Sequence, residues 1–448
     1  MVVITMNKNT AIDNEISIFW FRRDFRLNDN AGLFHALKNS KPVLALFIFD
    51  TEILERLPSK EDKRVVFIHH AISKLQHELL KVGSSLLVIH GKPLSVFENL
   101  LKKYSIKSVF ANSDYEPSSI MRDKSIVDLL ASKNITFQLF KDHVIFEKSE
   151  ILKEDGTPFK VFTPYSRAWK KKFNQDKICT FASESLLANF LKAQQFQLPT
   201  LSEIGFTDTA SYDIQPIIDE NIIRNYHKTR NLLGIIGTSN LSVHLRFGTI
   251  SIRELAMKAS KLNEEYLNEL IWRDFFMMIL FQFPYVADGC FKKKYANIGW
   301  RNNEEDFDKW CKGETGYPIV DAGMRELNET GLMHNRVRMI VASFLIKHLL
   351  IDWRWGEAYF AEKLLDYELA SNNGNWQWSA GCGCDATPYF RVFNPYEQIR
   401  KFDPDLIFTK KWVKNLDKSD YPTPIVEHKF ARERFLEVFK STLDNLYS

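Results

Sequence analysis

Two tryptophans, Trp376 and Trp378, flank Gln377 in the late part of the chain and precede the aromatic and polar run 389–395. Indole is the side chain most readily oxidised by one electron, and its flat face stacks well on nucleic-acid bases. Eight of the ten tryptophans lie after residue 271. This clustering indicates a domain that transfers electrons or stacks bases, although packing in a bulky core would also explain several of them.

Two stretches carry a family resemblance. The run 372–378, continued by 385–395, resembles the flavin-binding block of the DNA photolyase/cryptochrome family, and 19–26 resembles the same family near the start. The similarity covers almost the whole chain and is closest to the bacterial-type (class I) cyclobutane pyrimidine dimer photolyases. It implies one non-covalent FAD per chain and light-driven repair of cyclobutane pyrimidine dimers in UV-damaged DNA.

The stretch 237–242 precedes a helical pattern. Small hydroxyl residues with free backbone N–H groups near a helix start can hold a phosphate, although the pattern alone is more typical of a simple helix cap. The resemblance implies that several residues in and around this stretch bind FAD. These residues are Tyr226, Thr238, Ser239, Asn240, Leu241, Ser242 and Tyr266. At the position of Tyr266, other family members often have a tryptophan.

Arg338 lies in an apolar helical stretch, where a charge without a partner would be costly. In the family, an arginine and an aspartate at the positions of Arg338 and Asp366 form a salt bridge at the isoalloxazine ring. Tyr367 and Glu368 complete this cofactor loop. Because Arg336 is two residues before Arg338, the two side chains should point to nearly opposite faces, one to flavin and the other to DNA.

Asn372 matches the family position that faces N5 of the flavin. Asparagine there is typical of photolyases, whereas plant cryptochromes have aspartate and animal cryptochromes cysteine. An amide cannot readily donate a proton, so it favours anionic reduced flavin. From the residues alone, an asparagine in a tight turn before Asn373-Gly374 is equally plausible.

Trp376 and Trp378 are also two residues apart, so on a helix they should face different ways and have different roles. The resemblance places Trp376 beside the flavin and implies an electron-transfer chain from it through Trp353 to Trp300 at the surface. Three core tryptophans without a redox role are the alternative.

The resemblance places Trp378 and Trp272 on the substrate side, where two indoles could stack on flipped bases. Glu269 lies one helical turn before Trp272, so both can share a face, and its carboxylate could accept a hydrogen bond from a thymine. The other positions that match DNA contacts of the family are Arg230, Arg273, Asn335, Arg336 and Gln398.

The choice of lesion is predicted from His334 and Asn335. Relatives that repair (6-4) photoproducts carry paired histidines here as an acid–base couple, and this chain has one histidine followed by an amide. Opening a cyclobutane ring needs an electron and a polar pocket, so the sequence predicts repair of cyclobutane dimers and not of (6-4) photoproducts.

A second, antenna chromophore is left open between methenyltetrahydrofolate, a deazaflavin and none. Folate-binding relatives carry an Asn-Glu pair after a Tyr-Glu, whereas here Tyr115-Glu116-Pro117 is followed by Ser118-Ser119. The missing carboxylate removes a hydrogen-bond acceptor for the pterin, which predicts weak folate binding.

These residues need two kinds of scaffold. Short apolar runs at 16–21, 43–50, 85–91, 108–113 and 136–146 alternate with helical patterns such as 60–82 and 120–132, which predicts a doubly wound parallel sheet in an α/β domain at 15–146. Residues 147–214, with a short helical piece at 183–195, form a predicted connector. An all-α FAD- and DNA-binding domain follows at 215–448, with long helices predicted at 327–350 and 355–369. No G-x-G-x-x-G follows the first strand.

Composition excludes several protein classes. The five cysteines are few and odd in number, which argues against a disulfide framework and for the cytoplasm. Cys382 and Cys384 lack a second ligand pair, so no metal site is predicted. No segment is apolar enough to span a membrane, and residues 1–14 lack the apolar core of a secretory signal. A net charge of +4 is weak evidence for nucleic acid, and a monomer is expected.

Three competing functions remain on the same fold. They are a blue-light receptor of the cryptochrome type, a (6-4) photolyase, and a flavoprotein that binds DNA without activity. Asn372 and the short stretch of some fifty residues after Pro395 favour the dimer-repair enzyme over the receptor.

Overall fold

The computed structural model describes residues 15–39, 42–192, 195–208 and 215–444. Residues 1–14, for which no secretory signal is predicted, lie outside this part. The chain divides into two compact units. The α/β unit contains described residues of Met1–Glu147, Phe173–Ile217 and Leu241–Lys258, and the helical unit those of Lys148–Lys172, Ile218–Asn240 and Ala259–Ser448. The segment 147–214, predicted as a connector, contributes to both.

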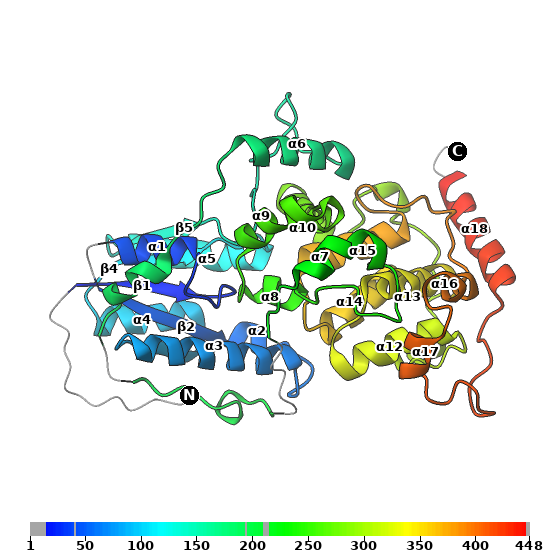
Figure 1. The fold of residues 1–448 in the computed structure, drawn as a ribbon, viewed down its shortest axis with the longest axis horizontal. Coiled ribbons are helices and arrows are strands. Elements are labelled where there is room, and N and C mark those ends of the chain that lie inside the picture. Colours follow the sequence, from blue (N-terminus) through cyan, green and yellow to red (C-terminus); the bar gives the residue numbers. More distant parts are fainter. Residues whose placement is uncertain (1–14, 40–41, 193–194, 209–214, 445–448) are drawn as a thin grey trace. The chain divides into compact units, whose positions relative to one another are not determined.

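The α/β unit is built on a five-stranded parallel sheet in the order β3-β2-β1-β4-β5 (Figure 1). Its central strand β1 is buried at every position because neighbouring strands and both sheet faces cover it. The strands are β1 (Ile16–Phe21), β2 (Val43–Asp50), β3 (Leu86–Gly91), β4 (Ile106–Asn112) and β5 (Thr136–Phe140). The predicted doubly wound parallel sheet is confirmed.

Helices lie on both faces of the sheet (Figure 1). Phe97 and Ile126, from the helices after β3 and β4, share one core with Ile18 and Leu46 of the sheet. On the other face, Gly32 packs against Phe19. The helices of this unit are α1 (Ala31–Lys38), α2 (Thr51–Leu54), α3 (Lys63–Lys81), α4 (Pro93–Lys103), α5 (Pro117–Ala131), α8 (Ser242–Phe247) and most of α9 (Ile252–Leu262), with the 3-10 turns η1 (Ser183–Asn189) and η2 (Ser202–Ile204).

The helical unit has no strand among its described residues. A large apolar core, which contains Trp310, Trp353 and Trp376, joins its C-terminal helices. Its helices are α6 (Phe162–Gln175), α7 (Glu220–Thr229), α10 (Glu264–Gln282), α11 (Glu304–Lys312), α12 (Pro318–Thr330), α13 (Asn335–Lys347), α14 (Trp353–Lys363), α15 (Leu369–Ala380), α16 (Pro395–Phe402), α17 (Ile407–Trp412) and α18 (His428–Asp444), with η3 (Pro284–Ala287) and η4 (Lys293–Tyr295).

Three predicted elements were too long. The helix expected over 327–350 is two helices, because Gly331 adopts a left-handed conformation that ends α12 before α13 begins. The helix expected over 355–369 ends at Lys363, and residues 364–368 form a loop before α15. The last strand ends at Phe140 rather than continuing to 146.

The proposed Asn/Gly turn at 372–374 was also wrong, since these residues lie inside α15. Two glycines instead allow close packing of this helix. A side chain at Gly374 would collide with the ring of Phe276 on α10, and one at Gly356 of α14 would collide with the indole of Trp376. Both contacts fix the position of α15 and therefore of the residues that it carries.

None of the described helices combines the length and the apolar character that crossing a lipid bilayer requires.

Candidate flavin and substrate site

Arg338 and Asp366 form an ion pair within the helical unit. The Nη2 atom of Arg338 lies 2.8 Å from Oδ2 and 3.1 Å from Oδ1 of Asp366, and its Nε donates to the carbonyl of Met333 at 2.8 Å. The Asp366 side chain is 4% exposed and that of Arg338 28%. A buried carboxylate needs such a partner, so the pair holds the loop before α15 against α13.

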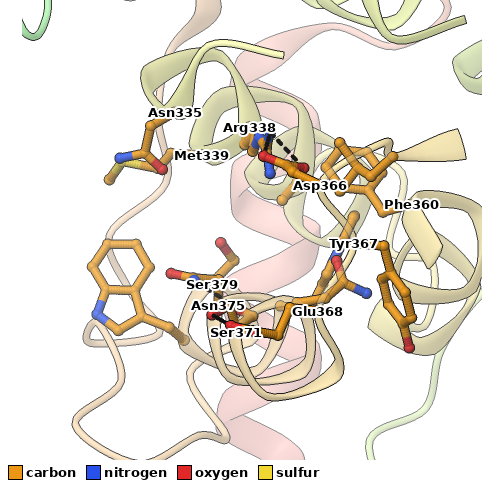
Figure 2. A pocket seen from close by; sticks show the side chains of 15 residues that line it. Asn335, Arg338, Met339, Phe360, Asp366, Tyr367, Glu368, Ser371, Asn375 and Ser379 are labelled. Atoms are coloured by element: carbon orange, nitrogen blue, oxygen red, sulfur yellow. Dashed lines mark hydrogen bonds and ion pairs between the residues drawn. The ribbon is translucent and has the colours of Figure 1, made fainter. Parts of the chain in front are cut away.

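This ion pair lies at the wall of a cavity between α13, the end of α14 and α15 (Figure 2). In the close-up, Arg338 and Asp366 point toward one another on one side, and Ser371, Asn375 and Ser379 lie across from them on α15. The cavity is lined by Asn335, Arg338, Met339, Ala342, Phe360, Leu364, Asp366, Tyr367, Glu368, Ser371, Asn372, Asn375, Trp376, Trp378 and Ser379. Several residues predicted separately for flavin and for substrate therefore meet in one cavity.

Asn372 is buried at the cavity wall, and its Nδ2 donates to the backbone carbonyl of Glu357 at 3.0 Å. The Glu357 side chain was missed in the sequence, although it lies against this amide. Burial raises the pKa of Glu357 to about 7, and hydrogen bonds from Asn373 and Asn372 oppose that shift. No sequence pattern marks Glu357, because its position depends on the packing of α14 against α15.

The three tryptophans of the expected electron-transfer chain belong to one core. Trp353 and Trp376 are buried in it, and the partly buried Trp300 packs against it. A further indole was not assigned from the sequence. Trp310 is fully buried, and its ring centroid is 6.2 Å from that of Trp376. The late clustering of tryptophan was the only signal that could have indicated it.

The two indoles expected to line one substrate wall have different surroundings. Trp378 lines the cavity, and Trp272 does not. Phe162 lies parallel to Trp272, with ring centroids 3.7 Å apart and an interplanar angle of 3°, so it covers one face of that indole. A base therefore cannot stack on the covered face while Phe162 stays in place. No sequence pattern indicates this contact, because the two residues lie on different helices far apart in the chain.

The predicted DNA-contacting cations are largely engaged inside the protein. Arg230 pairs with Glu269 at 2.7 Å. Arg273 pairs with Glu368 at 3.2 Å, and both of these side chains are nearly buried. Glu368 therefore partly neutralises the guanidinium charge of Arg273 within the protein, and the DNA contact expected for Arg273 stays a prediction.

Arg336 and Arg338 point in different directions, as their spacing predicts. Arg336 donates to Oδ1 of Asn231 at 2.7 and 3.0 Å and lies over the ring of Phe402. Of the remaining predicted DNA contacts, Asn335 is exposed at the cavity and Gln398 is half-buried on α16.

A second polar cluster involves the predicted FAD-binding residues of α7 and α10. The rings of Tyr226 and Tyr266 meet edge to face at 5.1 Å, and the Tyr266 hydroxyl lies 2.8 Å from the Ser239 hydroxyl. Thr238 donates to Asn240, which adopts a left-handed conformation, and α8 begins two residues later at Ser242. Leu241 and Ser242 are counted with the α/β unit, and Thr238–Asn240 with the helical unit.

Comparison with known proteins identifies the family. Residues 17–182 match the model for DNA photolyase, and residues 266–420 match the model for the FAD binding domain of DNA photolyase. The chain belongs to the DNA photolyase family. The deoxyribodipyrimidine photo-lyase of Alkalihalophilus pseudofirmus is 35% identical over an alignment that covers 95% of this chain and 98% of that protein.

Solved photolyase structures are also similar. A bacterial class III photolyase from Agrobacterium tumefaciens has a TM-score of 0.85 and 31% identity, and covers 98% of this chain and 99% of its own. An archaeal photolyase from Sulfolobus tokodaii, described with two FAD molecules, has a TM-score of 0.80 and 35% identity, with 95% and 99% covered. Membership of the photolyase family confirms three predictions: the fold of an α/β domain followed by an all-α domain, the lyase class, and the FAD cofactor.

The cavity fits the flat ring system of FAD. Met339, Phe360 and Trp376 offer apolar surface for the ring faces, and Arg338, Asp366 and Asn372 offer polar groups for its edge. These residue types match an amphipathic heterocycle, because apolar contact holds the ring and a few polar groups fix its orientation.

Proposed function

We propose that this photolyase repairs cyclobutane pyrimidine dimers in UV-damaged DNA. The supporting observation is that Arg338, Asp366, Asn372 and Trp376 share one cavity with Trp378 and Asn335. Reduced FAD, when bound and illuminated, supplies one electron that opens the cyclobutane ring and then returns, so no net oxidation or reduction occurs.

The flavin-side residues hold and orient the ring. Arg338, held in place by Asp366, would present its guanidinium group to a bound flavin ring and stabilise negative charge on it. Asn372 places a neutral amide in the wall, so no acidic proton is offered at that position. The apolar surface of Trp376 and Phe360 excludes water from the ring faces.

The substrate-side residues favour a dimer over a (6-4) photoproduct. Trp378 offers a stacking surface, and such stacking contributes roughly 1–3 kcal/mol per base. Asn335 supplies a polar group that cannot transfer a proton. Burial, followed by the nearby cations Arg336 and Arg338, lowers the pKa of His334 to about 4. An imidazole with so low a pKa is neutral at pH 7 and is a poor general acid there.

The remaining assignments follow the family. We infer that Trp376, Trp353 and Trp300 carry electrons to oxidised FAD, and that Tyr226, Tyr266 and 238–242 hold the rest of the cofactor. The residues that we assign to the DNA surface are Arg230, Arg336, Gln398 and Glu269. Trp272 could stack on a base only with the ring face that Phe162 leaves uncovered.

We infer that the protein acts as a monomer. A reducing compartment such as the cytoplasm fits the free state of its cysteines, which are Cys179, Cys290, Cys311, Cys382 and Cys384. A second chromophore, a deazaflavin or a weakly bound folate, is an open part of the proposal. The two FAD molecules of the Sulfolobus photolyase show that such a site can differ between relatives.

One experiment tests the function. Purified protein with reduced FAD is illuminated with oligonucleotides that carry either one cyclobutane thymine dimer or one (6-4) photoproduct, and the restored thymines are measured by chromatography. We expect repair of the dimer only, with a dark sample as control. Repair of the (6-4) product would contradict the lesion assignment, and repair of neither by fully reduced protein would contradict the enzyme.

A further inference from the structure

Two cysteines that the proposed function does not use lie together beside the middle tryptophan of the electron-transfer chain. Gln377 brings their segments together: its Oε1 accepts from the backbone N–H of Phe291 at 2.8 Å, and its Nε2 donates to the carbonyl of Gly289 at 3.0 Å. These residues flank Cys290. The sulfur of Cys382 lies 4.0 Å from the same Oε1, and its carbonyl accepts from the N–H of Lys292 at 2.8 Å.

Trp353 lies in the same apolar core as this pair. Its indole is 1% exposed, and its N–H is buried without an oxygen or nitrogen acceptor. Cys290 and Cys382 are themselves buried in the same apolar core as Trp353, and both are free thiols.

The surroundings of Cys290 favour a thiolate. Nη2 of Arg354 lies 4.0 Å from its sulfur, and the same guanidinium group lies over the ring of Trp353. A hydrogen bond from Cys382, followed by the charge of Arg354 and the N–H of Trp353, lowers the pKa of Cys290, whereas burial and the bond to Cys290 raise the pKa of Cys382. The guanidinium group of Arg354 therefore stabilises the thiolate of Cys290, and the thiolate is the reactive form of cysteine.

We propose that Cys290 and Cys382 form an internal dithiol electron donor that re-reduces Trp353 after it has been oxidised. The inference rests on the proposed electron route through Trp353. It assigns this photolyase a built-in source of two electrons, so that oxidised FAD can be fully reduced by light before any external reductant reaches the protein.

The chemistry balances over two light-driven steps. In the first, the Cys290 thiolate gives one electron to oxidised Trp353, and the resulting thiyl sulfur bonds to the sulfur of Cys382 as that thiol loses its proton. In the second, this sulfur pair gives its extra electron to Trp353 and becomes a disulfide. Starting from one thiolate and one thiol, the pair thus loses two electrons and one proton, and FAD takes both electrons and that proton.

The test counts thiols rather than repair. FAD-loaded protein with oxidised flavin and fully reduced cysteines is freed of reductant, illuminated without oxygen, quenched in acid and alkylated. Mass spectrometry then measures the peptide pair linked through Cys290 and Cys382. We expect about one such disulfide per FAD reduced, none in the dark, and none in illuminated Trp353→Phe.

Matched cysteine variants locate the donor. Cys290→Ala and Cys382→Ala should accumulate much less reduced FAD when no reductant is added, and added dithiothreitol should restore it. Cys384→Ala is the control, because this equally buried thiol donates to the carbonyl of Lys160 at 2.8 Å and should not affect either measurement.

Wild-type protein that reduces its FAD in light while both thiols remain fully alkylated would overturn the dithiol proposal. That result needs no variant to fold. If Trp353→Phe is still slow in the same experiment, the electron route stands and only the dithiol is rejected. Wild-type rates in Trp353→Phe would instead reject the route itself.

Discussion

Glu269 holds the guanidinium group of Arg230 at 2.7 Å, so an acidic and a basic residue expected to meet the substrate separately form one ion pair. Burial raises the pKa of Glu269, and Arg230 opposes that shift. A flipped base that approaches either residue therefore meets a group whose charge is already partly neutralised.

Glu269→Ala should weaken dimer repair without loss of FAD, because it removes a hydrogen-bond acceptor and releases Arg230. We expect a loss of about 1 kcal/mol, or roughly fivefold in kcat/KM for dimer repair. Glu265→Ala is the control, since Glu265 is more exposed and lies 3.6 Å from the same arginine. Unchanged repair in Glu269→Ala would show that the substrate pocket is misassigned.

Asp366→Asn should weaken FAD binding. The change leaves the charge of Arg338 without its partner, and with Arg338 partly exposed we expect a cost of about 1–3 kcal/mol, or roughly fivefold to 150-fold in Kd for FAD. The ratio of flavin to protein absorbance after dialysis measures it. Asp308→Asn, in the exposed pair with Lys312, should keep its flavin; equal retention by both variants would contradict the role of the Arg338–Asp366 pair.

Trp376→Phe and Trp353→Phe should slow the light-driven reduction of oxidised FAD by an order of magnitude or more. Repair by chemically reduced Trp353→Phe should survive, because the electron for repair does not pass through Trp353. Trp310→Phe distinguishes routes, since this indole lies 6.2 Å from Trp376. If Trp310→Phe is slow and Trp353→Phe is not, electrons leave Trp376 by the other branch.

His348 should make the protein less stable in acid. Burial, followed by the neighbours His428, Arg434 and Lys347, lowers the pKa of His348 to about 3. An unfolded histidine titrates near 6.5, so from about pH 6.5 down to about pH 3 the unfolded chain binds a proton that the folded chain does not. Stability therefore falls as pH falls through this window, by about 1–3 kcal/mol.

Urea unfolding of wild type and His348→Gln between these pH values measures the effect. The variant should show a flatter dependence of the unfolding free energy on pH, whatever its stability at pH 7. His77→Gln, at an exposed position, should keep the wild-type slope. An equal slope in His348→Gln would mean that other groups cause the acid sensitivity.

Purified protein should carry no stoichiometric folate. Ser118 and Ser119 replace the Asn-Glu pair of folate-binding relatives, and the Tyr115 hydroxyl already donates to Glu147 at 2.7 Å. Chromatography of the chromophores released in acid should find FAD, either together with a deazaflavin or without any second chromophore. One folate per chain after expression in a folate-producing host would contradict this expectation.

The sequence predicted the local features well. The strands at 16–21 and 43–50 have the expected bounds, because continuous apolar runs of that length suit a buried parallel sheet. The Arg338–Asp366 pair follows from the cost of a lone charge in an apolar helix together with the resemblance. Helix ends were less predictable where a single residue such as Gly331 ends a longer apolar pattern.

The misses are contacts between residues far apart in the chain. An Asn-Gly pair favours a turn locally, but Gly374 lies inside α15. Its lack of a side chain lets this helix pack against the ring of Phe276. The stack of Phe162 on Trp272 and the binding of Arg273 by Glu368 likewise depend on how helices pack. Periodicity gives the buried face of a helix and not the partner that it meets.

The contact between Gly356 and the Trp376 indole affects the rate of electron transfer through that indole. A methyl group there would push the Trp376 indole away from its place between α14 and the cavity. Electron tunnelling between rings falls exponentially with their separation, so a displacement of one bond length changes its rate severalfold. If electrons reach the flavin through Trp376 as proposed, the absence of a side chain at Gly356 sets the distance that they must cross, and a methyl group there should slow light-driven reduction of FAD.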